Sequence, residues 1–178
     1  MFQVNDYLVY GNEGVCRVDG IRSLSFEGSG EKLYYVLVPF GKARAQIFVP
    51  TEGSLVSKMR PVMTKKEVDA AIDAVAGKKL PWIEDRKRRT ALFRTIRAEA
   101  KCENLLLMLG CLYGRRRELA ALGKKLAFSD SDALLFGETI IHGEFSFALG
   151  IACDEVPSYI RSRLERAAAQ RVKIQRIE

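Results

Sequence analysis

The sequence predicts an α+β chain, in which a small β-barrel domain (residues 1–57) precedes an all-α domain of about five helices (residues 62–178). Two observations predict this division. Short apolar runs separated by Gly-rich turns fill the first part, and the apolar spacing becomes helical after Pro61. With 178 residues, of which 48% are hydrophobic and 29% charged, the chain has the composition of a globular protein of one or two domains.

The first domain contains segments of strand character separated by turn residues. Four or five strands in so short a domain favour a small closed barrel, because closure removes the sheet edges. The loop FEGSGEK (26–32) lacks the spacing of a phosphate-binding loop, and we interpret it as a hairpin turn. The domain is too small for a cofactor pocket, so we expect it to bind a partner along an edge. The predicted strands are YLVY (7–10), VCRVDGIRSL (15–24), LYYVLVPF (33–40) and AQIFVP (45–50).

The helical part begins with a capping box, Thr64 followed three residues later by Glu67, and Gly77 suits the end of this helix. A second helix is expected to start near Glu84, where acidic residues favour the helix N-terminus. The later helices are expected at about 103–122, from the caps Ser129 and Ser131 onward, and at about 154–176.

Two glycines, Gly110 and Gly114, lie four residues apart in the predicted third helix. We expect them to let another helix pack closely there.

The net charge of +7 is concentrated in one segment. Residues 1–57 carry five basic and six acidic side chains, whereas residues 78–125 carry 14 basic and five acidic ones. Such a concentrated excess is typical of a surface for a polyanion, usually nucleic acid, and the alternative is a merely solubilising face.

On a helical wheel, the second helix has a basic face beside an apolar face. Arg86, Lys87, Arg94 and Arg97 share one arc, while Arg89 falls among the neighbouring apolar residues. We predict that these five side chains contact DNA.

The only tryptophan, Trp82, lies in LPWIEDRKRR (80–89), directly before this helix. It could close a hydrophobic core, or it could insert into a nucleic acid whose phosphates the basic residues hold. We predict DNA contact for Trp82 and keep both interpretations open.

We find no catalytic constellation, metal site or cofactor site. The four cysteines form no C-x-x-C pair and are expected to be buried, reduced thiols, and His142 is the only histidine. The N-terminal MFQVNDYLVY has no signal-peptide pattern and no apolar run is long enough for a membrane span, so a cytoplasmic protein is expected.

Several segments, in this order, resemble the CarD/CdnL-type bacterial transcription regulators. VNDYLVYGNEGVCRVDGI (4–21), YYVLVP (34–39) and IFVPTEG (47–53) are similar to the family's N-terminal strands. GKKLAFSDSDALLFGETIIHGEFSFALGI (123–151) is similar to its late helical part, and the lone Trp82 follows the first helix as in the family.

The resemblance implies a Tudor-like (SH3-like) N-terminal barrel, shared with transcription-repair coupling factors, that docks on the RNA polymerase β subunit. It also implies that the helical domain contacts promoter DNA at the upstream edge of the transcription bubble. There the family's tryptophan acts as a minor-groove wedge, which Trp82 would match, and the outcome is a changed lifetime of the open complex.

We expect polymerase contacts from Arg22 and Phe48, and the apolar Phe48 stands where some family members have a basic residue. We expect a monomer that regulates transcription without catalysis, through RNA polymerase and promoter DNA. The alternative is a stand-alone nucleic-acid-binding protein with a Tudor-like module.

Overall fold

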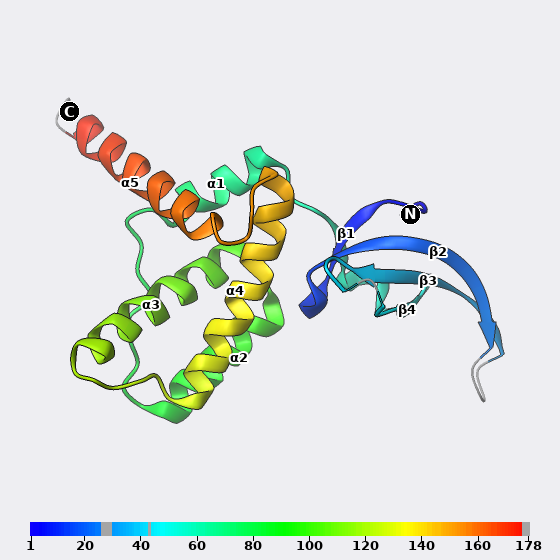
Figure 1. Cartoon of the computed structure of the whole chain (residues 1–178), viewed down its shortest axis with the longest axis horizontal. Coiled ribbons are helices and arrows are strands. Elements are labelled where there is room, and N and C mark those ends of the chain that lie inside the picture. Colours follow the sequence, from blue (N-terminus) through cyan, green and yellow to red (C-terminus); the bar gives the residue numbers. More distant parts are fainter. Residues whose placement is uncertain (26–29, 43, 176–178) are drawn as a thin grey trace. The chain divides into compact units, whose positions relative to one another are not determined.

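The computed structural model describes residues 1–25, 30–42 and 44–175, with side chains described up to residue 169. The chain divides into two compact units, Met1–Val62 and Met63–Glu178 (Figure 1). In the described residues, the first unit contains a five-stranded antiparallel sheet and the second contains five α-helices. The predicted α+β class, with a small β domain followed by a helical domain, is therefore confirmed.

The sheet has the strand order β4-β3-β2-β1-β5. The two longest strands pair across the predicted hairpin, with Ser25 opposite Glu31, and the turn residues 26–29 themselves lie outside the described residues. Short 3-10 turns follow the first strand and precede the last. The strands are β1 (Tyr7–Tyr10), β2 (Val15–Ser25), β3 (Glu31–Pro39), β4 (Ile47–Pro50) and β5 (Met59–Pro61).

The sheet ends in two edge strands, where we had expected a closed barrel. Among the described residues β4 pairs with β3 and β5 with β1, and no pairing joins β4 to β5. The sequence pattern does not predict the strand β5, because Pro61 is typical of a break between elements. Pro61 lies opposite Leu8 at the end of an edge strand, a position where the missing N–H of proline is tolerated.

One face of the sheet forms the core of the first unit. Side chains that alternate along β2 and β3 contribute to this cluster, and Tyr34 and Val36, on the other face of β3, are buried as well. Residues of β1, β4 and β5 complete the cluster. Its buried members are Leu8, Cys16, Val18, Tyr35, Leu37, Val49 and Met59.

The helices begin and end close to the predicted positions. The capping box is confirmed, since the Thr64 hydroxyl accepts from the Glu67 N–H and the Glu67 carboxylate accepts from the Thr64 N–H at 2.7 Å. Gly77, with φ of 75°, follows the C-cap residue Ala76 at the end of this helix. The helices are α1 (Lys65–Val75), α2 (Arg86–Glu99), α3 (Cys102–Ala121), α4 (Phe128–Leu149) and α5 (Val156–Gln175).

The predicted caps of α4 are wrong. This helix begins at Phe128 without a side-chain cap, so Ser129 and Ser131 lie inside its first turn. Asp130, between them, is only 2% exposed and faces the interior.

The close helix contact predicted at Gly110 and Gly114 is also wrong. A Cβ built at either glycine meets no atom within 4 Å. The close approach occurs instead at Gly137 of α4, where a Cβ would lie 2.8 Å from Leu109 of α3.

Polar contacts fasten α5 to α1 in the helical unit, where the two helices lie side by side (Figure 1). The Tyr159 hydroxyl donates to Asp69 at 2.6 Å, and Arg163 donates from Nε to Asp73 at 2.8 Å. Apolar side chains from all five helices form the core of this unit, with Phe145 and Met108 fully buried.

The cysteines are free thiols, as expected, but they are not all buried. Cys16 lies in the core of the sheet, whereas Cys153 is exposed. Burial raises the pKa of Cys16 to about 11, so this thiol stays protonated at neutral pH.

Candidate nucleic-acid interface

The helix α2 has the basic face and the apolar face that its sequence predicts. Phe93 and Ile96 are buried in the core of the helical unit, and Arg86, Lys87 and Arg94 are exposed on the other side. No ion pair joins these three basic residues to another residue of the described chain. They therefore present uncompensated positive charge to the solvent.

Arg97 belongs to the same face, but its charge is partly compensated. Its Nη1 atom lies 2.6 Å from the Asp132 carboxylate, and its guanidinium carbon lies 4.4 Å from the ring centre of Phe136. Both partners belong to α4. A phosphate would have to compete with Asp132 for this side chain.

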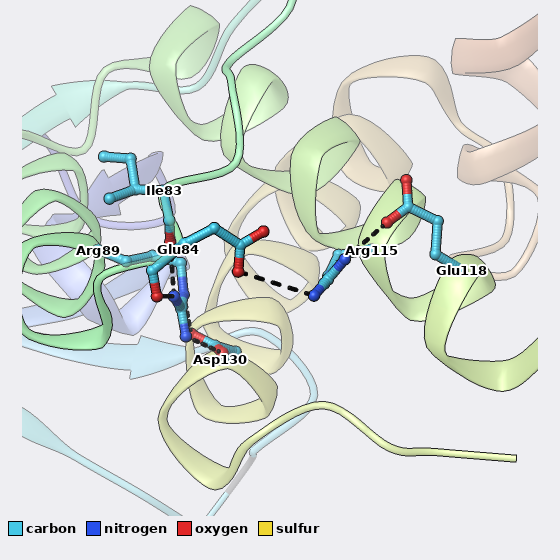
Figure 2. A network of polar contacts seen from close by, with 6 residues as sticks. All are labelled: Ile83, Glu84, Arg89, Arg115, Glu118 and Asp130. Atoms are coloured by element: carbon cyan, nitrogen blue, oxygen red, sulfur yellow. Dashed lines mark hydrogen bonds and ion pairs between the residues drawn. The ribbon is translucent and has the colours of Figure 1, made fainter. Parts of the chain in front are cut away.

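Arg89 does not belong to the basic surface, contrary to our prediction. It is 6% exposed and forms a two-point contact with Asp130 of α4, with Nε to Oδ1 at 3.0 Å and Nη2 to Oδ2 at 2.9 Å. Its Nη1 donates to the carbonyls of Ile83 and Glu84, at 2.6 and 3.1 Å (Figure 2). The physical reason is its place on the apolar arc of α2, where an arginine is buried only with such partners.

Trp82 is half-buried and packs against the core of the helical unit. The guanidinium carbon of Arg89 lies 4.1 Å from its ring centre, and that of Arg115 lies 5.0 Å away. Its indole Nε1 is buried and has no hydrogen-bond partner among the described residues. The side chain thus packs against the core, as a structural tryptophan would, but it is not fully enclosed, as a residue that contacts DNA would require.

Arg115 of α3 connects the Trp82 loop to a third helix. Its Nη1 lies 3.0 Å from the Glu118 carboxylate and its Nη2 lies 3.9 Å from that of Glu84, with Glu84 between the two arginines in Figure 2. Two helices therefore hold the loop that follows Trp82. Arg89 of α2 binds two of its backbone carbonyls, and Arg115 of α3 lies near the Glu84 carboxylate.

The sequence alone gave little indication of this arrangement. The position of Arg89 among apolar residues of α2 is the one signal of its burial in the sequence. Its partner Asp130 could not be found, because the two residues are 41 positions apart and Asp130 matched a helix-capping pattern.

In the first unit, the two predicted polymerase-contact residues share one face of the sheet. Arg22 of β2 lies opposite Tyr34 of β3, and Phe48 of the edge strand β4 lies opposite Val36 of β3. Because Tyr34 and Val36 are two residues apart, all four side chains lie on the same face. This is the face opposite to the core residue Tyr35, and both Arg22 and Phe48 are exposed on it.

The described residues offer no group of three or more His, Cys, Asp or Glu side chains that could hold a metal ion. Within the same residues, no helix is both long and apolar enough to cross a membrane.

Comparison with known proteins assigns the first unit. No curated protein matches the chain. Residues 2–63 match the CarD-like/TRCF RID domain, and this range contains all five strands of the sheet. The match agrees with the resemblance found in the sequence and with the compact unit Met1–Val62. Residues 2–63 are therefore similar to the CarD-like/TRCF RID domains, a family that interacts with RNA polymerase.

Proposed function

We propose that this protein is a bacterial transcription regulator that docks on the RNA polymerase β subunit and contacts promoter DNA at the upstream edge of the bubble. It acts in the cytoplasm, as a monomer and without catalysing a reaction, by changing the lifetime of the open promoter complex. The observation that supports this most strongly is the RID domain at residues 2–63, followed by a unit with an uncompensated basic helix face.

On the polymerase side, the proposed contact is the outer face of the sheet next to β4. The edge strand offers backbone groups to a strand of the partner, and Arg22 and Phe48 provide a charged and an aromatic contact on one face. The near-neutral charge of residues 1–57 gives this domain little attraction for DNA.

On the DNA side, the proposed phosphate contacts are Arg86, Lys87 and Arg94. These side chains are exposed, lie on one helix and have no acidic partner among the described residues. Phosphate contacts carry no sequence information, so this surface positions the protein on DNA without selecting a promoter. Arg97 contributes less because of Asp132.

Trp82 is the proposed wedge, and it has to leave its docked position to act. The docked indole leaves the Nε1 donor buried and without a partner among the described residues, a penalty of about 1–3 kcal/mol. This penalty lowers the free energy needed to undock the side chain. In the minor groove the same N–H would meet acceptors on the base edges.

The test measures the lifetime of open promoter complexes formed by bacterial RNA polymerase with the full-length protein. We expect Arg86→Glu/Arg94→Glu to abolish most of the effect on lifetime, while capture of polymerase by the protein is unchanged. The matched control is Lys65→Glu/Lys66→Glu, which changes the net charge equally on exposed positions of α1.

Equal loss in both variants would assign the effect to net charge alone and contradict the proposed surface. Tight DNA binding without any polymerase dependence would favour a stand-alone nucleic-acid-binding protein instead.

A further inference from the structure

Two hollows on the helical unit join into one groove. One, of about 690 Å³, lies between α3, the segment 78–82 and Leu164 of α5. The other, of about 510 Å³, lies between α3, α4 and α5. They share Val75, Leu106, Gly110, Arg117 and Leu164, so they form one continuous depression along α3, which we call the α3 groove.

The groove is open because α3 carries glycine where a neighbouring helix could have packed. Gly110 and Gly114 are one turn apart, and a Cβ built at either would meet nothing within 4 Å. The contact between α3 and α4 is made elsewhere, at Gly137. Among the described residues of the helical unit, none covers this apolar face of α3 at the two glycines.

The walls of the groove are mainly aliphatic. Leu106 and Val75 form part of the core beneath it, and Leu107 and Leu164 are only partly buried against that core. A continuous apolar hollow of this size on a soluble unit is typical of a binding surface for another apolar group.

The rim of the groove is strongly basic. Glu118 and Glu138, the acidic residues of its lining, are both engaged, with Arg115 and with the Tyr113 hydroxyl respectively. No ion pair joins the other cations of the lining, Lys78, Lys79, Arg116, Arg117 and Arg161, to another described residue. A partner that fills the groove therefore needs apolar groups flanked by negative charge.

We propose that the α3 groove binds an acidic amphipathic helix of a partner protein. Such a helix places aliphatic side chains at i, i+3, i+4 and i+7 on one face, which can enter the hollow next to Gly110 and Gly114. Its Asp and Glu residues then face the cations of the rim.

Nucleic acid matches the groove less well, although it is also acidic. The walls offer aliphatic side chains, whereas single-stranded bases bind to open aromatic faces. Both the indole and the phenol ring of the lining already carry a guanidinium: that of Arg89 lies 4.1 Å from the ring centre of Trp82, and that of Arg116 lies 5.0 Å from the ring centre of Tyr113. The inference does not depend on the promoter function proposed above, although Trp82 belongs to both surfaces.

Trp82 provides the test, because it is the only tryptophan of the chain and lines the groove. The probe is a designed helical peptide with leucines at i, i+3, i+4 and i+7 and glutamates elsewhere, titrated into the full-length protein without DNA or polymerase. We expect a saturable change in Trp82 fluorescence. A peptide with lysines in place of the glutamates is expected to bind at least tenfold more weakly.

Two variants separate groove binding from other causes. Gly110→Leu places a side chain in the groove, and we expect it to weaken binding of the acidic peptide at least tenfold. Gly143→Leu is the matched control, since Gly143 of α4 is also a helical glycine with open space around its Cβ and does not line either hollow. Both changes favour helix formation, so neither is expected to lower the melting temperature.

Equal binding of the acidic and basic peptides would overturn the inference, as would unchanged binding by Gly110→Leu. A short DNA duplex that displaces the acidic peptide from wild type, and binds Gly110→Leu more weakly, would assign the groove to nucleic acid instead. None of these outcomes bears on the open-complex test, because the titration contains neither polymerase nor promoter.

Discussion

Trp82 links packing and function at the scale of one residue. It is half-buried and stacked on Arg89, so Trp82→Ala should cost about 2 kcal/mol, less than the 3–5 kcal/mol of a fully packed aromatic residue. That corresponds to a fall of about 4–8 °C in the melting temperature of a chain of this size. Phe93→Ala, at a buried core position of α2, is the control and should show the full core cost.

The second part of the same prediction concerns the promoter. We expect Trp82→Ala to capture polymerase normally and to shorten the open-complex lifetime, because a wedge offsets the unstacking of one base step. Thermal destabilisation with an unchanged lifetime would mean that Trp82 serves packing alone.

Arg89 and Asp130 should act as one unit. Removing either partner leaves a buried charge unpaired and should cost about 3–5 kcal/mol, whereas an apolar pair such as Arg89→Met/Asp130→Leu should recover most of that loss. The measurement is a double-mutant cycle of thermal unfolding.

The apolar pair cannot donate to the Ile83 and Glu84 carbonyls. We therefore expect it to restore stability without restoring the open-complex effect. Recovery of both would show that Arg89 does not position the Trp82 loop.

His142 gives the chain a predictable pH dependence. Burial lowers its pKa, and the nearby Glu138 opposes this shift only partly. With the folded-state pKa below the unfolded value of about 6.5, the unfolded state binds the proton more readily. The free energy of unfolding should therefore fall as the pH decreases below about 6.5.

Because His142 is the only histidine, His142→Gln should remove most of this slope between about pH 5.5 and 7 in thermal unfolding. An unchanged slope in that variant would assign the titration to another group.

At the scale of elements, the sequence predicted the helices better than the site. The box of Thr64 and Glu67 identifies α1 because it uses only local hydrogen bonds. The caps predicted for α4 are wrong, since Ser129 and Ser131 lie inside its first turn and Asp130 pairs with Arg89, 41 positions away. Arg86, Lys87 and Arg94 are exposed, as their shared helix face predicts, whereas Arg89, whose position depends on a second helix, is buried.

The basic face of α2 makes a quantitative prediction for DNA binding without polymerase. If Arg86, Lys87 and Arg94 neutralise three phosphates, the affinity should fall about 40-fold between 50 and 200 mM salt. A full contribution from Arg97 would raise this factor to about 150-fold. The measurement is a salt titration with a short duplex, and an affinity independent of salt would contradict the phosphate contacts.

At the scale of the whole molecule, the sequence resemblance located the domain that matches the RID family, because the succession of strands and turns is encoded locally along residues 2–63. It did not reveal that the sheet ends in two edges, since strand pairing joins distant segments such as β1 and β5. Nor did it reveal the α3 groove. The groove exists because Gly137, and not Gly110 or Gly114, is the glycine that closely approaches a neighbouring helix.

The proposed function requires the two units to act through their covalent connection. DNA binding by three basic residues is weak alone, but docking of the first unit on polymerase would raise the effective concentration of the second unit near the promoter. A flexible Gly-Ser insertion between Val62 and Met63, the boundary of the two units, should lower that concentration without touching either surface. We expect normal polymerase capture and a smaller effect on open-complex lifetime that decreases further as the insertion is lengthened.

The same insertion between the exposed Lys124 and Lys125, inside the second unit, is the control and should leave the effect in place. An effect that does not depend on the insertion at Val62 would mean that one unit alone produces it, and it would contradict the division of roles proposed for this chain.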